Sequence, residues 1–330
     1  MKKLARRLAK IGFIRKGIKK LIWALDRSLV EPQLLSFAPP LPLPPNTIPQ
    51  NLIPDFTLDN AIKVAYSYCA EVNGDGAVHN SAKEYKKVFK QIKNRSFRYY
   101  GAEINAFYAA FERYTFSDKT VLVWGLAGCN CEALSIYNNA RKVYVVDYNK
   151  PICDHPQIEV LTHEELNKKD LKTDFAISYS SFEHDGLGRY GDPIDPIGDL
   201  KAMKAAHNSL KEGGILFLGV PLGKDLLCWN LHRIYGKIRL PLLLKGWRCE
   251  EIFDIYDGSP FDESIELGQH RQSLMVLRKI NDDYPSDEEL NETIGRKSNN
   301  AKEARNNQIL AQINQFVLDY KNARAKGDRD

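Results

Sequence analysis

The stretch Val121-Leu-Val-Trp-Gly-Leu-Ala-Gly-Cys-Asn130 joins an apolar run to small residues and then to a helical pattern. Four apolar residues bounded by glycine indicate a buried strand, and residues 131–139 have the spacing of a helix. Glycines in such a turn let the backbone approach a ligand and open the helix N-terminus toward it. The stretch therefore predicts a strand–turn–helix unit of an α/β sheet with a ligand site at the turn.

Strand and helix patterns continue to alternate after this unit, as expected for an α/β fold. The predicted strands are 142–147, 158–161, 175–180, 215–220, 247–256 and 273–279. A helix is predicted over 197–210, and residues 225–244 are predicted to be helical in parts, including Trp229–Tyr235.

An acid stands at the end of the second predicted strand. Asp147 follows Gly125 by 22 residues, and an acid at this place can accept hydrogen bonds from both hydroxyls of a ribose. The glycine turn and the strand-end acid together indicate a nucleotide-type ligand.

The loop Ser178–Pro196 carries more functional groups than a connection needs, because most such connections have two to six residues. It lies at the carboxyl end of a strand, where α/β proteins bind ligands. His184 is the candidate base, since an imidazole titrates near pH 6.5. Glu183 is expected to orient it or bind substrate, and Arg189 and Tyr190 to bind an anionic or hydroxylated substrate. The pairs Asp192-Pro193 and Asp195-Pro196 are typical of turns.

Residues 119–280 resemble the class I S-adenosylmethionine-dependent methyltransferases. The resemblance rests on Val121–Gly128, Asp147, Asp174–His184 and Leu200–Pro221. More narrowly, Phe182–Pro193 is similar to an uncharacterised family of unknown function first described from nematode proteins.

The resemblance implies a Rossmann-like sheet of seven strands, mostly parallel, with the last strand antiparallel. It implies S-adenosyl-L-methionine as cofactor, with contacts from Gly125, Gly128, Asp147, Glu164 and Ser180. The reaction implied is methyl transfer to an oxygen or nitrogen of a small-molecule or glycan-type acceptor, with His184 as base. The first-strand acid of the superfamily is absent, because Val123 stands in its place.

Two other functions stay open. A methyltransferase-like domain that binds a partner or a membrane without chemistry would explain Val123. A nicotinamide-dependent oxidoreductase would also use Asp147 for its ribose, although the Glu183-His184 pair and the final strand pair argue against it.

Positive charge is concentrated at the N-terminus. Residues 1–30 hold ten Lys or Arg and one acid, a net charge of +9. Because the whole chain has a net charge of +5, the remaining residues carry −4. Apolar residues at three- and four-residue steps predict a basic amphipathic helix, which suits an anionic membrane surface or docking on a protein. Nucleic acid is disfavoured because the body is acidic.

The remaining organisation follows from composition. Residues 31–57 are expected to be a Pro-rich linker, 58–118 a helical cap, 119–280 the Rossmann-like domain and 281–330 a polar helical tail. The six cysteines are scattered, which indicates a reducing, cytoplasmic compartment and disfavours a metal site. The chain has no uncharged apolar stretch of about 18 residues, so membrane contact would be peripheral, on the inner face. Nothing in the sequence indicates an oligomeric state.

Overall fold

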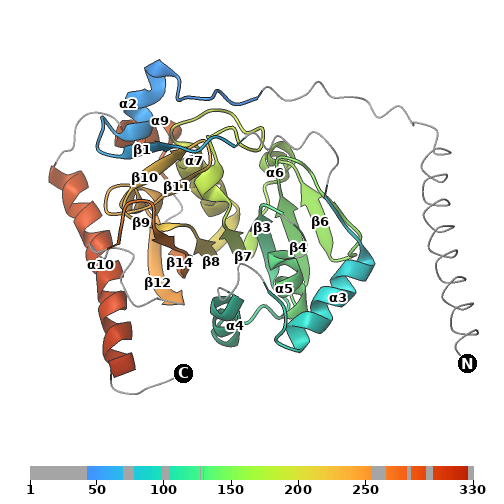
Figure 1. Ribbon diagram of the computed structural model, residues 1–330. Helices are drawn as coiled ribbons and strands as arrows, with labels where there is room; N and C mark the ends of the chain where they lie inside the picture. Colours follow the sequence, from blue (N-terminus) through green and yellow to red (C-terminus); the bar gives the residue numbers. More distant parts are fainter. Residues whose placement is uncertain are drawn as a thin grey trace, which may run out of the picture. The chain divides into compact units, whose positions relative to one another are not determined.

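The main sheet of the computed structural model has the strand order β12-β14-β8-β7-β3-β4-β6 (Figure 1). The structure describes residues 43–69, 78–98, 104–126, 128, 130–253, 265–280, 284–294 and 300–325. The strands are β3 (Thr120–Trp124), β4 (Lys142–Val146), β6 (Ile158–Leu161), β7 (Thr173–Tyr179), β8 (Leu210–Gly219), β12 (Trp247–Phe253) and β14 (Leu274–Lys279). The pairs β6–β4, β4–β3, β3–β7 and β7–β8 are parallel. The last strand, β14, runs antiparallel to both β8 and β12, so the predicted Rossmann-like sheet is confirmed.

The two faces of this sheet are buried by different helices, because side chains alternate along each strand. Leu122 and Trp124 of β3 face one apolar cluster, and Val121 and Val123 face the other. The first cluster includes residues of α6 (His163–Lys169), α7 (Gly198–Asn208) and α8 (Leu240–Leu243). The second includes residues of α3 (Ala82–Lys93), α4 (Ile104–Arg113) and α5 (Cys131–Tyr137). Both faces are therefore apolar, as a parallel sheet requires.

A second, three-stranded sheet corrects two helix predictions. It consists of β1 (Lys63–Tyr66), β10 (Leu226–Trp229) and β11 (His232–Ile234) in the order β1-β10-β11. The segment 58–72, the start of the expected helical cap 58–118, contains the strand β1 in place of a helix. The predicted helix Trp229–Tyr235 is wrong as well, because β10 and β11 form an antiparallel pair. Burial of Leu227 and Trp229 against Phe56 stabilises strands here, and tertiary packing overrides local propensity.

Short elements complete the described part. The expected linker 31–57 includes η1 (Gln50–Leu52) and α2 (Ile53–Thr57), and Ile48 and Phe56 are buried. Two-residue strands pair β2 (His79–Asn80) with β5 (Ile152–Cys153) and β9 (Leu222–Gly223) with β13 (His270–Arg271), while η3 (Phe182–His184) follows β7. The basic helix predicted for residues 1–30 lies outside the described residues. No helix among the described residues has the length and apolar character to cross a membrane.

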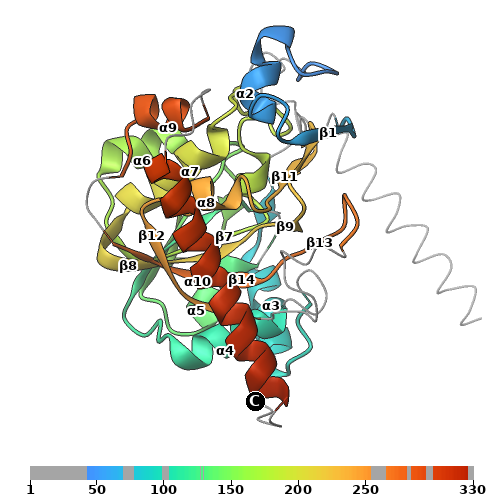
Figure 2. The same ribbon diagram turned by 90° about the vertical axis from the view of Figure 1, so that its left-hand side faces the viewer.

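The C-terminal tail packs on the body. It contains α9 (Asp287–Ile294) and α10 (Asn300–Ala325), and α10 lies along α8 and β12 (Figure 2). Leu290 and Ile313 are fully buried in the first apolar cluster, so the tail is part of the hydrophobic core.

The tail's contribution to stability can be measured with two matched substitutions. Ile313→Ala should lower the free energy of unfolding by about 2–4 kcal/mol, because it leaves a cavity in the core. Leu318→Ala, on the same helix but 51% exposed, should change it by less than about 0.5 kcal/mol. Urea unfolding followed by circular dichroism tests this, and equal effects would show that the packing of α10 is not maintained in solution.

Candidate functional site

Three strand ends bring most of the predicted ligand-binding residues to one edge of the sheet. Gly125 follows β3, Asp147 follows β4 and Ser180 follows β7. Because β3 lies between β4 and β7 and all three are parallel, these residues share the carboxyl edge, where open α/β sheets bind ligands.

The turn after β3 requires glycine. Gly125 has a φ of 76°, and a Cβ on it would lie 2.9 Å from Oγ of Ser181. Gly128 has a φ of 120°, which L side chains rarely adopt. The turn therefore lies directly against the end of β7.

The carboxylate of Asp147 fixes this turn and can still accept further hydrogen bonds. Its Oδ2 accepts the N–H of Leu126 at 2.9 Å, and its Oδ1 accepts the N–H of Asn149 at 2.8 Å. A carboxylate has about four acceptor positions, so two of them stay available for hydroxyl groups of a ligand.

Glu132 supports the same turn, and the sequence analysis missed it. It is fully buried and accepts hydrogen bonds from the N–H of Asn130 at 3.1 and 3.2 Å and from the hydroxyl of Tyr85 at 3.2 Å. Burial raises the pKa of Glu132 to about 7. The signal that would have found it is a single acid among apolar helical residues directly after the glycine turn.

Glu183 occupies the turn after β7. Its side chain is 1% exposed. Oγ of Ser180, a residue with a φ of 55°, donates to its Oε1 at 2.9 Å. Burial raises the pKa of Glu183 to about 7, so the carboxyl group is only partly ionised at neutral pH.

His184 is held in one tautomer. Its Nδ1 donates to the carbonyl of Leu231 at 2.7 Å, and a carbonyl only accepts, so the proton of the neutral ring is on Nδ1. Nε2 lies 3.7 Å from Oε1 of Glu183. Burial lowers the pKa of His184 to about 3. The ring is therefore neutral and a much weaker base than an exposed histidine.

The other two loop residues lie beside His184. Arg189 Nη1 donates to the carbonyl of Leu231 at 3.3 Å, and its guanidinium lies 4.9 Å from the ring centre of Tyr190. Tyr190 meets the ring of His184 edge to face at 5.3 Å. The structure thus brings Glu183, His184, Arg189 and Tyr190 together, as the loop sequence predicted.

Two further histidines extend this cluster. His232, on β11, lies 6.3 Å from His184 and 5.4 Å from His270, measured between ring centres. Burial and the neighbouring cations lower the pKa of His232 to about 4.

Glu164 also follows a strand at the carboxyl edge, since α6 begins directly after β6, but its side chain is turned to solvent. Its side chain is 77% exposed and bonds to Lys168 within α6 at 2.5 Å. The neighbouring His163 instead stacks on Tyr148, with ring centres 4.0 Å apart. Burial lowers the pKa of His163. Sequence reasoning missed this ring pair, although Tyr148 directly follows Asp147.

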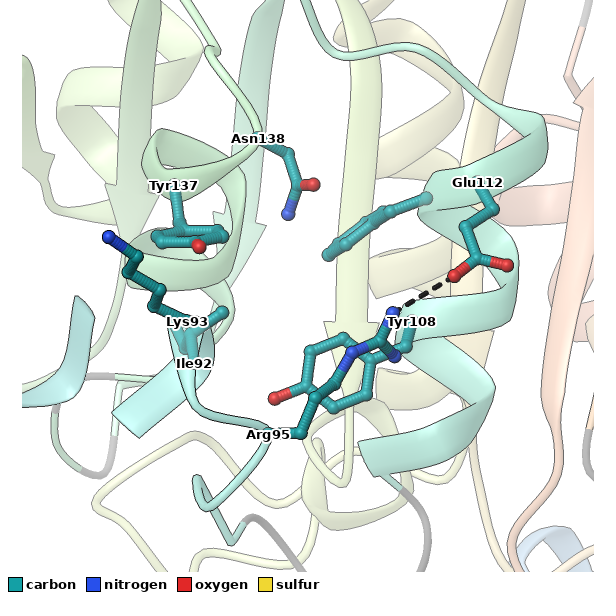
Figure 3. A pocket seen from close by; sticks show the side chains of 8 residues that line it. Ile92, Lys93, Arg95, Tyr108, Glu112, Tyr137 and Asn138 are labelled. Carbon is teal, nitrogen blue, oxygen red and sulfur yellow. Dashed lines mark hydrogen bonds and ion pairs between the residues drawn. The ribbon is translucent and has the colours of Figure 1, made fainter. Parts of the chain in front are cut away.

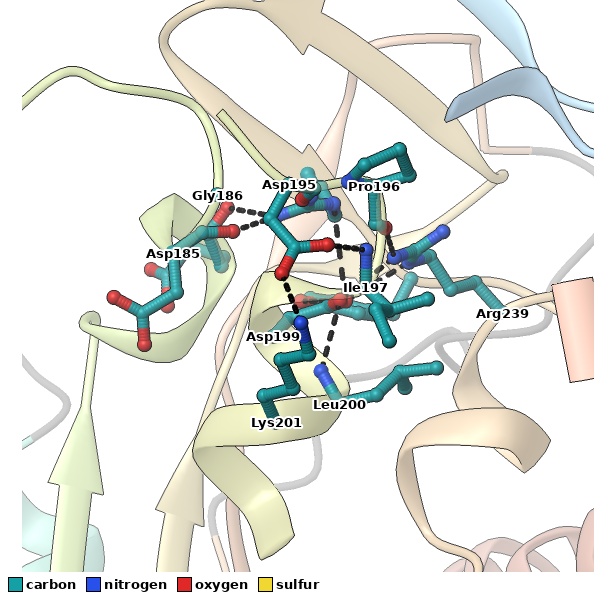
Figure 4. A network of polar contacts seen from close by, with 12 residues as sticks. Asp185, Gly186, Asp195, Pro196, Ile197, Asp199, Leu200, Lys201 and Arg239 are labelled. Atoms are coloured by element: carbon teal, nitrogen blue, oxygen red, sulfur yellow. Dashed lines mark hydrogen bonds and ion pairs between the residues drawn. The ribbon is translucent and has the colours of Figure 1, made fainter. Parts of the chain in front are cut away.

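The aspartates of the loop have structural roles, as predicted. Oδ2 of Asp192 accepts the N–H groups of Gly186 and Gly188 at 2.7 and 2.9 Å. Oδ1 of Asp195 accepts the N–H of Ile197, and Lys201 pairs with its Oδ2 (Figure 4).

A buried ionic cluster of Asp199, Arg239 and Arg233 fixes the position of the loop. Arg239 donates to both carboxylate oxygens of Asp199 at 2.8 and 2.6 Å, and the hydroxyl of Tyr235 donates to Oδ2 (Figure 4). Arg233, from β11, donates to the carbonyls of Asp185 at 2.6 Å and Asp195 at 3.4 Å. The two ends of the loop are thereby tied to α7 and β11.

A separate hollow of about 170 Å³ lies between α3, α4 and the end of α5 (Figure 3). Tyr108 and Tyr137 line it, and Arg95 pairs with Glu112 at its rim at 3.0 Å. The end of α5 lies beside the start of β3, since the N–H of Asp118 donates to the carbonyl of Asn139. The hollow is therefore at the opposite edge of the sheet from Gly125 and Asp147.

The comparison with protein families agrees with the narrower resemblance, to a family first described from nematode proteins. Residues 118–280 match the model of the family described as "Caenorhabditis protein of unknown function, DUF268". No curated protein matches the chain in sequence.

Three solved structures are similar at low identity. The 1,6-didemethyltoxoflavin-N1-methyltransferase of Burkholderia thailandensis, solved with S-adenosylhomocysteine, is 15% identical over 63% of this chain and 93% of its own, with a TM-score of 0.38. A proposed S-adenosylmethionine-dependent methyltransferase from Listeria monocytogenes is 13% identical over 54% and 98%, with a TM-score of 0.35. A proposed hemolysin from Streptococcus thermophilus is 14% identical over 68% and 78%, with a TM-score of 0.34.

Removing the central carboxylate tests the ionic cluster. Asp199→Ala leaves two buried guanidinium groups without their counter-charge, so the free energy of unfolding should fall by about 3–5 kcal/mol. Glu164→Ala removes an exposed pair and should cost less than about 0.5 kcal/mol. Chemical unfolding measures both, and a small loss for Asp199→Ala would contradict the cluster's anchoring role.

Glu132 gives a pH-dependent prediction. Its folded-state pKa of about 7 lies above the ordinary 4.5, so its contribution to stability declines as the pH rises from about 4.5 to 7. Glu132→Gln removes that decline. Relative to the unaltered chain, the variant should gain about 2–3 kcal/mol in free energy of unfolding between pH 5 and pH 8. Parallel urea titrations at the two pH values test this; a constant difference would mean that Glu132 titrates normally.

Proposed function

We propose that this chain, whose residues 118–280 match the DUF268 family model, is an S-adenosyl-L-methionine-dependent methyltransferase acting on a small-molecule or glycan-type acceptor. The observation that carries the proposal is the meeting of the Gly125 turn, Asp147 and the Ser180–His184 turn at one edge of the sheet. Enzyme sites of open α/β proteins are built at this edge.

The residues present fit the adenosine end of this cofactor. Gly125 and Gly128 have positive φ angles that give the turn after β3 a conformation L side chains rarely adopt, and Asp147 has acceptor positions for two ribose hydroxyls. Gly128 and Ser180 lie at the same edge. Glu164 is the weakest of the proposed contacts, because its side chain bonds to Lys168 on the exposed side of α6.

The acceptor would bind beside the Ser180–Tyr190 loop. The cofactor, when bound, supplies a methyl group on a positively charged sulfur. The chain must position the nucleophile in line with that methyl group and accept a proton when the nucleophile carries one. Glu183 and His184 are the proposed acid–base groups, and Arg189 and Tyr190 the proposed substrate contacts.

Val123 favours a second candidate, a methyltransferase-like protein that binds without chemistry. It is 1% exposed within the apolar core, so the position of the superfamily's first-strand acid is closed to a ligand. In that case residues 1–30 would serve at an anionic membrane surface on the cytoplasmic side, which co-sedimentation of the full chain and a chain lacking residues 1–30 with anionic vesicles tests.

Calorimetry with S-adenosylhomocysteine tests the main proposal. The full chain should bind it, and Asp147→Ala should weaken binding about tenfold or more, because two hydrogen bonds are lost. Glu112→Ala, at the opposite edge of the sheet, serves as the control and should change the dissociation constant less than threefold. Absence of binding by the unaltered chain, or binding of NADH in its place, would overturn the proposal.

A further inference from the structure

The carboxyl group of Glu183 has an unusual set of partners. Oε1 accepts from Ser180, and the backbone N–H groups of Glu183 and Ser181 also interact with the carboxyl group. Oε2 makes no hydrogen bond of standard geometry among the described residues, although the side chain is 1% exposed. Buried polar atoms in native proteins are almost always paired, and exceptions point to functional sites or to ligands. An unpaired carboxyl oxygen at the carboxyl end of β7 is therefore a candidate contact for a bound molecule.

The ring of His184 lies near Oε1 of Glu183 and does not hydrogen-bond to Oε2. With the proton of its ring on Nδ1, bonded to Leu231, Nε2 presents a lone pair 3.7 Å from Oε1. Two acceptors face one another here, which is favourable only when a proton lies on one of them. Burial disfavours the charged form of both groups, so His184 stays neutral, and the carboxyl group, whose pKa is raised to about 7, is the carboxylate that can accept a proton only at neutral pH and above.

The position of Glu183 is fixed relative to the proposed cofactor turn. Ser180 and Ser181 precede it, and Ser181 lies against Gly125. The carbonyl of Glu183 accepts from Arg233 at 3.5 Å, within the buried cluster. The backbone of Glu183 is thus fixed beside the Gly125 turn, and the bond from Ser180 fixes its carboxyl group at the end of β7.

We propose that Glu183, and not His184, takes the proton of the acceptor, and that His184 and Ser180 are positioning residues. This rests on the proposed function. The nucleophile's lone pair forms a bond to the methyl carbon as the carbon–sulfur bond breaks and its electron pair stays on sulfur. The proton of the nucleophile passes to Oε2 of Glu183, and the electrons of that bond stay on the nucleophile.

The chemistry restricts the acceptor. A buried carboxylate repels an anion, so a nucleophile that is already ionised would bind poorly beside it. The acceptor is therefore a neutral alcohol, phenol or amine whose reacting oxygen or nitrogen carries a proton. Burial also raises the pKa of Glu183 to about 7, which suits a base that works near neutral pH.

The test compares two cofactor analogues and needs no known acceptor. Sinefungin carries an amine where S-adenosylmethionine carries its methyl group, and S-adenosylhomocysteine carries nothing there. If Oε2 faces the transfer point, the full chain should bind sinefungin at least tenfold more tightly than S-adenosylhomocysteine at pH 8. Glu183→Gln should abolish most of that preference while changing the dissociation constant of S-adenosylhomocysteine less than threefold.

Two more variants complete the design. Glu112→Gln alters an exposed acid beside the separate hollow at the opposite edge of the sheet, and it should leave the preference unchanged. Glu183→Asp keeps the carboxylate but moves it back by one methylene group, so it should reduce the preference for sinefungin. This variant replaces Glu183→Gln in the test if the Gln variant does not fold. A preference equal in the unaltered chain and both Glu183 variants would overturn the inference alone. Failure of both analogues to bind would overturn the proposed function and this inference with it.

Discussion

The buried cluster of Asp199, Arg239 and Arg233 is the constraint on which the site depends. Each charged group is almost inaccessible to solvent, so its desolvation must be offset by hydrogen bonds of good geometry. The bidentate pair of Arg239 with Asp199 meets this requirement. Arg233 also donates to the carbonyls of Asp185 and Asp195. These hydrogen bonds satisfy its buried guanidinium group and at the same time fix the backbone of the loop.

The same exclusion of water determines the protonation of the loop. Burial is the largest cause that raises the pKa of Glu183 and lowers that of His184, because it disfavours the charged form of each group, and Arg189 and Arg233 lower the pKa of His184 further. Asp185 follows the same rule, and burial raises its pKa well above the ordinary value. The carboxyl groups of Glu183 and Asp185 are thereby harder to ionise, and the ring of His184 is harder to protonate, than the same groups in water.

The main sheet and the meeting of Gly125, Asp147 and the Glu183–His184 turn follow from sequence. Strand runs such as Val121–Trp124 are apolar on both faces, and parallel topology brings their ends together. The β10–β11 pair was missed, because the run around Trp229 shows neither period clearly and its burial depends on distant residues. The exposure of the Glu164 side chain and the stacking of His163 on Tyr148 depend on how the segments after β4 and β6 approach one another. Local sequence does not encode that approach.

The small sheet has a consequence for the limits of the domain. β1 pairs in parallel with β10, and Trp229 donates from its indole N–H to the carbonyl of Pro45. Residues 43–66, 284–294 and 300–313 lie outside the segment 118–280 that matches the family model, yet side chains among them, such as Phe56, Leu290 and Ile313, are part of the hydrophobic core. The unit defined by homology is thus smaller than the unit that folds. A chain cut to the family boundaries would expose the apolar surfaces that its two flanks now cover, and the strand carrying Arg233 would lose its neighbour's support.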